Sequence, residues 1–301
     1  MSNLTKLVYH GHFLAILVLV PLVLNIFVTY VLFQEKALNT DFLQVTYLDI
    51  GQGDSIFIQA PHGQTMLIDA GLPTSNALAG IGKLVPFYEK SIDVVMASHP
   101  DADHIGGLPN VIKNYKPGVF IESGVSARTE IDTALHDELR KQNIHTLFAR
   151  RGMKILLDET NNVVIDILFP DRDVSTWTKN TNDASIVARL KYGNETFLFN
   201  GDSPIKIEEH LIQTLRKEAL NIDVLKVGHH GSRTSTSDIF VKYIQPRIAI
   251  ISAGKENRYK HPHNEVIEVL KKNNVEILRT DQQGTITYET DGKQHRTRNK
   301  K

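Results

Sequence analysis

The sequence predicts an α/β protein of the α+β type, in which two β-sheets pack together with helices outside them, preceded by one transmembrane helix. Two runs of predicted strands are each followed by strands that alternate with helices, a pattern that favours two packed sheets. A long uncharged apolar stretch precedes the first strand. The chain of 301 residues suits one large domain with an accessory segment.

Residues 13–33 carry no formal charge and are interrupted only by Pro21, Asn25 and Thr29. A helix of about 20 apolar residues crosses a membrane, whereas a secretory signal has a shorter apolar region and a small-residue cleavage site. We therefore expect a single-pass anchor over residues 13–33, with a cleaved signal or a buried core helix as alternatives. The sparse cationic residues place the short N-terminus, residues 1–12, in the cytoplasm and the body outside the cytoplasm, at the cell membrane.

After a linker at residues 34–41, the body opens as a β-meander with tight turns. Strands are expected at residues 42–50, 55–60 and 64–69. Strands and helices then alternate, with strands expected at residues 93–98, 119–122 and 146–149, and helices after Gly107 and at residues 129–142.

The second half repeats this order. Strands are expected at residues 163–169, 184–192 and 196–200, before a helix at residues 204–220. Later strands are expected at residues 223–227, 247–252, 275–279 and 284–289, with helices at residues 237–244 and 264–272. The predicted domain covers residues 42–290, and the basic residues 291–301 are expected to form a frayed tail.

The amino-acid composition limits which side chains could bind a metal ion. Lys plus Arg and Asp plus Glu both number 34, so the net charge favours no particular partner. The chain has no cysteine, so a metal site must use imidazole and carboxylate ligands.

Ligand-type side chains are concentrated in residues 98–107, which read Ser-His-Pro-Asp-Ala-Asp-His-Ile-Gly-Gly. Two imidazoles and two carboxylates, those of His99, Asp101, Asp103 and His104, fall within six residues directly after an apolar strand. A strand-to-helix loop lets such side chains converge on a rigid scaffold. This density is typical of a metal site.

Similar residues recur at other predicted strand ends, namely Asp69, Asp202, the pair His229-His230, and His261-Pro-His263. One such Asp alone is more often a turn or helix cap. The coincidence of five positions favours divalent Zn, Mn or Fe, and a carboxylate such as Asp202 can bridge two ions. The sequence therefore predicts a dinuclear site.

Several ordered motifs carry a family resemblance. They are LDIGQGDS at residues 48–55, LIDAG at 67–71, NDAS at 182–185, NGD at 200–202, KVGHHGS at 226–232 and HPH at 261–263. Residues 99–104 match the general pattern H-x-H-x-D-H except for Asp101 in place of the second His. Over residues 42–289 the chain resembles the metallo-β-lactamase superfamily, and within it the hydrolase domain of the ComEC competence proteins, which shares that replacement.

The resemblance implies an αββα four-layer sandwich that holds two divalent ions, Zn or Mn, at the edge of its paired sheets, with a metal-bridging hydroxide as nucleophile. One ion is assigned to His99, Asp101 and His230, the other to Asp103, His104 and His263, and Asp202 lies between them. The family's usual intervening His is absent at residues 182–185. Asp101, Asp202 and His229 are assigned catalytic roles, His229 as proton donor or phosphate contact.

Two ligand assignments stay open. A register shift of one residue would exchange His229 and His230, since alternate residues of a strand face opposite ways. His261 is the alternative ligand to His263. If His261 does not bind metal, we expect it behind the ligands or in a turn.

Residues around the ligands are expected to support them or the substrate. Asp69 would orient a ligand imidazole or brace its loop, and Asp54 carries a motif position that need not contact metal. Ser232 would cap the following segment or bind substrate. Cationic side chains beside the motifs are candidates for contacts to phosphate oxygens, namely Lys226, Arg233, Arg258 and Lys260.

These features predict a membrane-anchored, metal-dependent phosphodiesterase or DNase, with single-stranded DNA as the substrate implied by the resemblance. A phosphocholine esterase or another ester or lactone hydrolase of the cell envelope is the first alternative. A metal-stabilised binding module without turnover is the second, and it would leave no open ligand position. Because the chain has one predicted span, DNA transport would need a separate channel protein.

Overall fold

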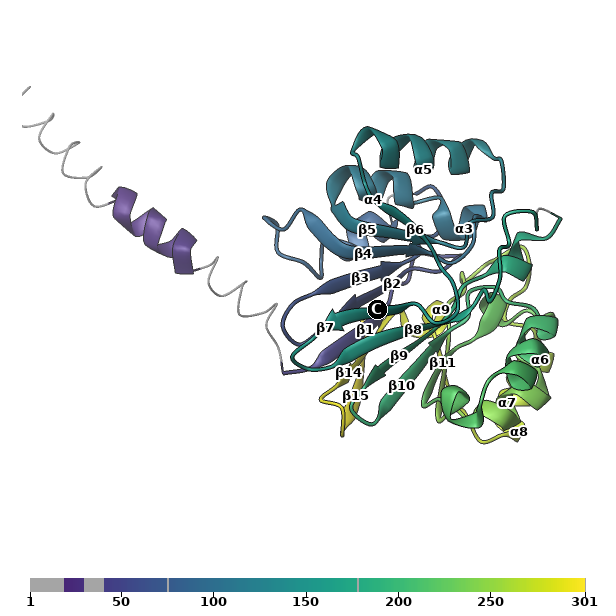
Figure 1. The fold of residues 1–301 in the computed structure, drawn as a ribbon. Coiled ribbons are helices and arrows are strands. Elements are labelled where there is room, and N and C mark those ends of the chain that lie inside the picture. Colours follow the sequence, from purple (N-terminus) through teal and green to yellow (C-terminus); the bar gives the residue numbers. More distant parts are fainter. Residues whose placement is uncertain (1–18, 30–40, 75, 178, 301) are drawn as a thin grey trace, which may run out of the picture.

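Two β-sheets face each other in the computed structural model, with helices on both outer faces (Figure 1). The structure describes residues 19–29, 41–74, 76–177 and 179–300. The expected mixed α/β fold with two sheets is confirmed.

The first sheet has the strand order β15-β14-β1-β2-β3-β4-β5-β6 over the described residues. Neighbours are antiparallel from β15 to β3 and parallel from β3 to β6. Its strands are β1 (Leu43–Tyr47), β2 (Ile56–Gln59), β3 (Thr65–Ile68), β4 (Ser91–Ala97), β5 (Lys116–Glu122), β6 (Thr146–Phe148), β14 (Thr285–Thr290) and β15 (His295–Lys300).

The second sheet has the order β13-β12-β11-β10-β9-β8-β7 in the same described part of the chain. Neighbours are antiparallel from β7 to β10 and parallel from β10 to β13. Its strands are β7 (Lys154–Asp158), β8 (Val163–Phe169), β9 (Val187–Tyr192), β10 (Glu195–Phe199), β11 (Val224–Lys226), β12 (Ile248–Ile251) and β13 (Glu276–Arg279).

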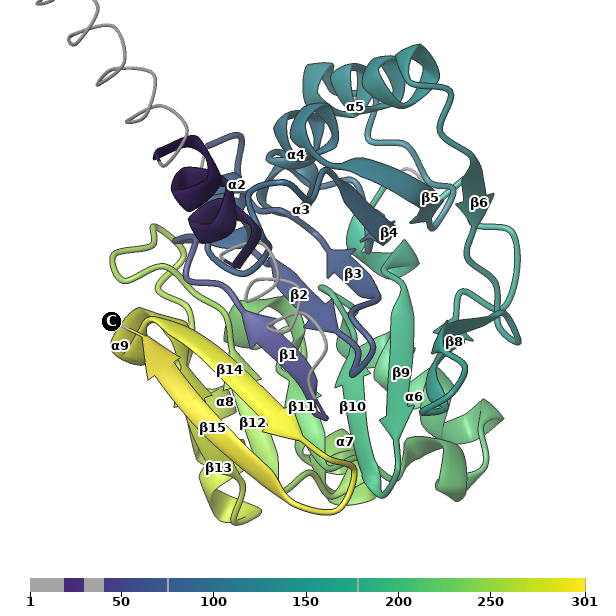
Figure 2. The same ribbon diagram turned by 90° about the vertical axis from the view of Figure 1, so that its left-hand side faces the viewer.

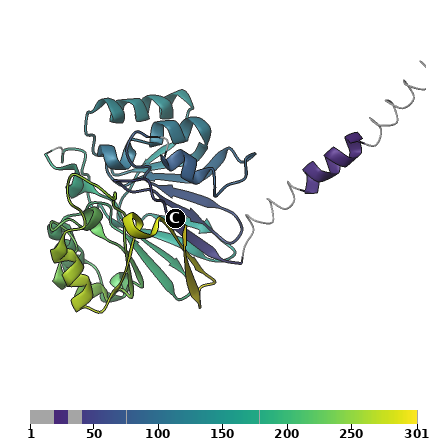
Figure 3. The ribbon, with the colours of Figure 1, turned by 180° about the vertical axis from the view of Figure 1, so that it is seen from behind.

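Each sheet has its own helical layer, which is also visible from behind (Figure 3). The helices on the first sheet are α2 (Asn76–Ile81), α3 (Ala102–Ile105), α4 (Leu108–Asn114) and α5 (Glu130–Lys141). Those on the second are α6 (Ile205–Thr214), α7 (Asp238–Ile244) and α8 (Asn264–Lys272). The short α9 (Thr280–Gln283) joins β13 to β14, and the 3₁₀ turns are η1 (Thr181–Ala184), η2 (Lys217–Leu220) and η3 (Gly228–Gly231).

The largest apolar cluster lies between the sheets and draws on both of them. Tyr288 of β14 packs edge-on against Phe197 of β10, with ring centroids 5.1 Å apart. Strands β2, β3 and β12 are buried at every position. Burial on both faces explains why these strands are continuous apolar runs instead of alternating patterns.

Side-chain caps set the start of two helices. Thr129 accepts a hydrogen bond from the Asp132 amide, 3.2 Å away, at the start of α5. Ser237 accepts one from the Phe240 amide, also 3.2 Å away, at the start of α7. Each cap satisfies a backbone donor that the first helical turn leaves unpaired.

The sequence prediction missed α2, α3 and β7, and it was wrong at the C-terminus and at the helix expected over residues 204–220. The expected frayed tail is wrong for His295–Lys300, which pairs antiparallel with β14 as β15 (Figure 2). Arg298 Nε donates to the buried Glu289 carboxylate at 2.9 Å, so a strand partner neutralises the basic residues. The helix expected at residues 204–220 ends at Thr214 and is followed by η2.

The expected membrane span at residues 13–33 lies partly outside the described residues. Residues 19–29 are helical, and the apolar side chains of that segment are exposed. Among the residues described, no helix is both long enough and apolar enough to cross a bilayer.

Candidate metal centre

Five strands of the two sheets end beside one cluster of buried imidazoles and carboxylates. Asp69 follows β3, His99 follows β4, Asp202 follows β10, His230 follows β11, and the Ser252 carbonyl follows β12. Helix α3 adds Asp103 and His104. The cluster therefore joins the first sheet to the second.

Carboxylate oxygens and imidazole Nε2 atoms converge at the centre of this cluster. His104 Nε2 lies 3.2 Å from Asp202 Oδ1, and His230 Nε2 lies 3.6 Å from the same oxygen. His230 Nε2 is 3.4 Å from Asp103 Oδ2, and His99 Nε2 is 4.0 Å from Asp202 Oδ2. Four overlapping groups have ligand atoms within 4.8 Å of one another: His99, His104 and Asp202; Asp103, His104 and His230; Asp54, Asp69 and His104; and Asp54, Asp202 and His230.

The Nδ1 atom of each buried imidazole, which faces away from the centre, contacts a neighbouring polar group. His104 Nδ1 bonds Asp69 Oδ2 at 2.8 Å, and His230 Nδ1 donates to the Ser252 carbonyl at 3.0 Å. Ser98 Oγ donates to Asp69 at 2.6 Å and lies 3.0 Å from His99 Nδ1. Because a carbonyl only accepts, His230 Nδ1 carries a proton, and its Nε2 faces the centre. Asp69 makes the contact that its predicted orienting role requires.

Several of these central atoms are buried without a hydrogen-bond partner in the described part of the chain: Nε2 of His99, His104 and His230, and Oδ1 of Asp202 and Asp54. The short approach of His104 Nε2 to Asp202 Oδ1 lacks hydrogen-bond geometry. Buried polar atoms left unpaired are costly in a folded protein. Imidazole nitrogens and carboxylate oxygens are the donors that bind divalent transition metals, so the residues fit a metal ion.

Neighbouring charges shift the pKa values of the buried groups in this cluster. Burial opposes protonation of His104, but the Asp202 and Asp69 carboxylates outweigh it and raise the pKa of that imidazole well above its usual value. Burial also opposes ionisation of Asp202, yet the His104 and His230 charges hold the pKa of that carboxyl well below its usual range. Asp202 thus stays ionised and stabilises positive charge on the imidazoles around it.

Asp54 and Lys226 form a buried ion pair behind the cluster. Lys226 Nζ lies 2.6 Å from Asp54 Oδ2 and donates to the Val227 carbonyl at 2.9 Å. Burial opposes ionisation of Asp54, but the Lys226 ammonium lowers the pKa of that carboxyl. Lys226 is fully buried, so its predicted contact to phosphate is wrong.

The approach of Gly53 to α3 places Asp54. The amide of Asp54 donates to the Asp103 carbonyl at 3.2 Å. A Cβ atom on Gly53 would lie 2.2 Å from that carbonyl oxygen, and the φ of Gly53 is +119°. Only glycine combines this backbone conformation with so close a contact.

His229 and His230 occupy η3 with positive φ values of 49° and 54°. These strained conformations turn both rings toward the cluster. His229 is partly exposed, with Nε2 at 3.5 Å from Asp202 Oδ2 and Nδ1 at 3.0 Å from Thr234 Oγ1. His230 is the buried member of the pair.

The predicted division of ligands between two ions differs from the geometry. His230 lies with Asp103, His104 and Asp202, whereas the sequence assigned it to the ion held by His99 and Asp101. Asp101 Oδ2 is 3.7 Å from His99 Nε2 and partly exposed, and Thr181 Oγ1 donates to its carboxylate.

Neither the expected ligand His263 nor its alternative His261 belongs to any of these groups of the described chain. The Nδ1 atom of His263 accepts a hydrogen bond from the Arg233 amide at 3.1 Å. His261 is buried instead, with its ring 6.2 Å from His230 and 5.6 Å from His229, and its Nδ1 has no partner among described residues. Burial lowers the pKa of His261 to about 4.

The remaining candidates lie at the rim. Arg233 is exposed and lies 3.7 Å from Glu265, and Arg258 is exposed with its guanidinium 4.7 Å from the Tyr259 ring centroid. Ser232 Oγ accepts from Thr234 Oγ1 at 3.0 Å, so it closes a local turn.

Sequence reasoning missed Ser98, Thr181 and the Ser252 carbonyl. Ser98 is the last residue before the ligand motif, and its place at the end of β4 was the available signal. No sequence signal pointed to Thr181 or Ser252, because Thr181 contacts Asp101, 80 residues away, and Ser252 contacts His230, 22 residues away.

A match to the Metallo-beta-lactamase superfamily spans residues 48–255 and includes most of this cluster. This chain belongs to that superfamily. Its fold binds divalent metals, and its members are generally metal-dependent hydrolases, which agrees with the converging imidazoles and carboxylates.

Competence proteins are among the relatives of this superfamily member, so the predicted resemblance is confirmed. The chain is 32% identical to ComE operon protein 3 of Bacillus subtilis, over 87% of the chain and 34% of that protein. It is 28% identical to Competence protein ComA of Neisseria gonorrhoeae, over 86% of the chain and 34% of that protein. The chain thus spans about a third of the length of these relatives.

A solved structure, the metallo-beta-lactamase fold protein YhfI of Bacillus subtilis, is also similar. It aligns with a TM-score of 0.47 and 13% identity, over 78% of this chain and 95% of that one.

Proposed function

We propose that the protein is a metal-dependent phosphodiesterase that hydrolyses single-stranded DNA. The observation that carries the proposal is the set of buried, unpartnered Nε2 atoms of His99, His104 and His230 around Asp202. Ligand atoms that lie this close together without hydrogen-bond partners form the preorganised arrangement that a catalytic metal site needs.

The named residues would hold two divalent ions, Zn or Mn, with Asp202 between them. When bound, such ions would supply Lewis acidity, which lowers the pKa of a water from about 15.7 toward about 7. Hydrolysis then needs no side-chain nucleophile.

Other groups of the protein hold the candidate ligand rings in position. Asp69 and Ser98 fix the His99 and His104 rings, and the Ser252 carbonyl fixes His230. His229 would donate a proton or contact phosphate, a role supported by its partial exposure and by the 3.5 Å between its Nε2 and Asp202 Oδ2.

The choice of substrate is supported by the relatives and by the rim. The chain resembles competence proteins and, at 30% identity over 83% of its length, Recombination protein 2 of Haemophilus influenzae. Arg233, Arg258 and Lys260 are exposed and lie next to the KVGHHGS and HPH motifs in the sequence, and they offer charge-assisted contacts to phosphate oxygens.

The purified full chain in mild detergent, supplied with Mn or Zn, should cleave single-stranded DNA or a bis-aryl phosphate. His99→Ala should abolish cleavage, while His145→Ala, an exposed histidine outside the cluster, should retain it. The proposal fails if neither substrate is cleaved, or if His99→Ala and the unaltered chain cleave alike.

We further propose that residues 13–33 anchor the chain in the cell membrane with the hydrolase domain outside the cytoplasm. The support is the uncharged apolar run of 21 residues, whose length suits a bilayer. In DNA uptake a separate channel protein would then move the strand that is not degraded.

A further inference from the structure

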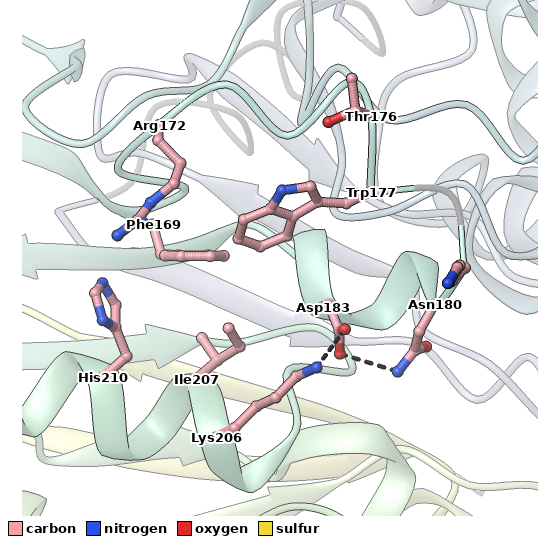
Figure 4. A pocket seen from close by; sticks show the side chains of 10 residues that line it. Phe169, Arg172, Thr176, Trp177, Asn180, Asp183, Lys206, Ile207 and His210 are labelled. Atoms are coloured by element: carbon pink, nitrogen blue, oxygen red, sulfur yellow. Dashed lines mark hydrogen bonds and ion pairs between the residues drawn. The ribbon is translucent and has the colours of Figure 1, made fainter.

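A cavity of about 530 Å³ opens on the second sheet's helical side, between the loop after β8 and α6 (Figure 4). Its wall combines Phe169, Trp177 and Ile207 with the cationic Arg172, Lys179 and Lys206. This volume is in the range of small-molecule sites. No role in the metal centre accounts for it.

The aromatic wall is built from Trp177 and Phe169. Their ring centroids lie 6.2 Å apart at an angle of 41°, and Phe169 is fully buried whereas Trp177 is half-buried. Trp177 packs at the edge of two apolar clusters, one of which holds Val125, Val174 and Ala184. The indole is therefore fixed in place while part of it faces the cavity (Figure 4).

The indole N–H of Trp177 has no hydrogen-bond partner among the described residues. An aromatic ring that is held rigidly and keeps a free donor can stack on a ligand and bond its edge at little entropic cost.

Cations flank this ring. Arg172 and Lys206 are 59% and 61% exposed although each contacts one carboxylate, that of Asp171 and Asp183 respectively. Lys179 makes no ion pair within the described chain. Three cations and one carboxylate line the cavity, so it favours an anionic ligand.

The cavity shares a wall with the metal centre through η1. Asp183 of η1 lines the cavity and pairs with Lys206. Two residues earlier, Thr181 donates to Asp101, and two residues later Ser185 Oγ accepts from the Asp202 amide at 3.3 Å. One short segment thus separates the cavity from the candidate ligands.

We propose that this cavity binds one base of a single-stranded nucleic acid, stacked on Trp177, while the flanking cations contact its phosphates and direct the chain to the metal centre. The inference rests on the proposed phosphodiester substrate and names a positioning subsite for it. Base–aromatic stacking tolerates every base because each has a π-face, so the subsite would confer single-strand preference without sequence preference.

Trp177 is the one tryptophan of the sequence, so its fluorescence reports the subsite directly. The full chain would be titrated with a short oligothymidylate in the presence of EDTA, which prevents turnover, and in parallel with an abasic oligonucleotide of equal length. Saturable quenching by the oligothymidylate is expected, with affinity for the abasic strand weaker by about tenfold. Equal quenching by both strands, or quenching by neither, overturns the proposal.

Variants extend the test by anisotropy of a labelled oligothymidylate. Trp177→Ala should weaken binding by about tenfold and Trp177→Phe by much less, since a smaller ring still stacks. Phe87→Ala, which alters a 55% exposed aromatic residue outside the cavity, is the matched control and should bind as the unaltered chain does. Equal binding by all three variants contradicts the subsite. If the Ala variant misfolds, the comparison of oligothymidylate with the abasic strand in the unaltered chain decides the test.

The outcome of the binding experiments can be distinguished from the outcome of the hydrolysis assay. Base-dependent quenching without hydrolysis would support the subsite and contradict the phosphodiesterase. Hydrolysis with base-independent binding would support the phosphodiesterase and overturn the subsite.

Discussion

Asp69 is the residue on which the orientation of two imidazoles depends. It accepts hydrogen bonds from the Ser98 amide at 2.8 Å and the Ser98 hydroxyl at 2.6 Å, and it holds His104 Nδ1 at 2.8 Å. It is fully buried. Asp69 thus contacts His104 directly and reaches His99 through Ser98, so we expect it to orient both imidazoles.

Asp69→Asn should weaken metal binding by about 10- to 100-fold, because the amide presents an N–H group where an acceptor is needed. Chelator competition measures this affinity. Asp93→Asn is the control, since Asp93 similarly accepts from the Thr65 amide at 2.7 Å without touching an imidazole. Equal metal affinity in both variants would reduce Asp69 to a loop brace.

His261 and His263 can be distinguished by the same measurement. His261→Ala should lower bound metal and activity more than His263→Ala, because His261 is buried next to His230 whereas His263 Nδ1 is occupied by a backbone amide. Metal content per chain is read by elemental analysis. A larger loss in His263→Ala would restore the ligand expected from the sequence.

Lys226 stabilises the fold through Asp54. Removing one partner of a buried ion pair leaves an uncompensated charge, so Lys226→Met should lower the free energy of unfolding by about 3 to 5 kcal/mol. Lys260→Met alters an exposed lysine and should change the free energy of unfolding little. Urea unfolding distinguishes them, and an unchanged midpoint for Lys226→Met would argue against the bracing role.

The sequence could predict which residues gather because most follow apolar strands whose ends meet at one edge of a sheet. It could not predict how Asp103 and His230 pair, because that depends on how two separate sheets face each other. The choice between His261 and His263 depends on the Arg233 amide, a contact between residues 30 apart. Local pattern contains no information on such contacts.

At the scale of elements, His136 links α5 to β5. Its Nε2 lies 3.1 Å from Glu122 of β5, and its Nδ1 lies 3.2 Å from Asp132 of its own helix. Hydrogen bonds to Asp132 and Glu122 raise the pKa of His136 from 6.5 to about 10. Folding therefore favours the protonated ring.

A raised folded-state pKa stabilises the protein fully below the unfolded pKa and loses this contribution as pH rises through the folded value. The unaltered chain should exceed His136→Gln in stability most at about pH 6, and the difference should shrink toward about pH 10. Urea midpoints at both pH values test this. A difference that grows with pH would have the wrong sign for this linkage.

Elements with strong apolar signals were predictable, as β4 and β12 illustrate. Strand β7 was missed because it has alternate exposed positions and lies at a sheet edge, where little is buried. Strand β15 was missed because its basic residues resemble a tail until Glu289 is placed between Arg296 and Arg298. Both strands depend on tertiary partners more than on their own residues.

At the scale of the whole molecule, the candidate metal centre connects two halves. His99, Asp103 and His104 come from the first sheet's side, and Asp202 and His230 from the second. An ion bound there would bind the folded arrangement and not the unfolded chain, in which these residues are far apart. Metal binding is thus coupled to the stability of the entire domain.

Zinc or manganese at about 100 times its dissociation constant should add about 2.7 kcal/mol to the free energy of unfolding. For a domain of this size that raises the melting temperature by about 5 to 10 °C relative to the EDTA-treated chain. His145→Ala should show the same shift and His104→Ala a much smaller one, because His104 belongs to three of the four candidate ligand groups in the described chain. A full shift in His104→Ala would place the stabilising ion elsewhere, and no shift in the unaltered chain would mean that the two sheets pack without help from a metal.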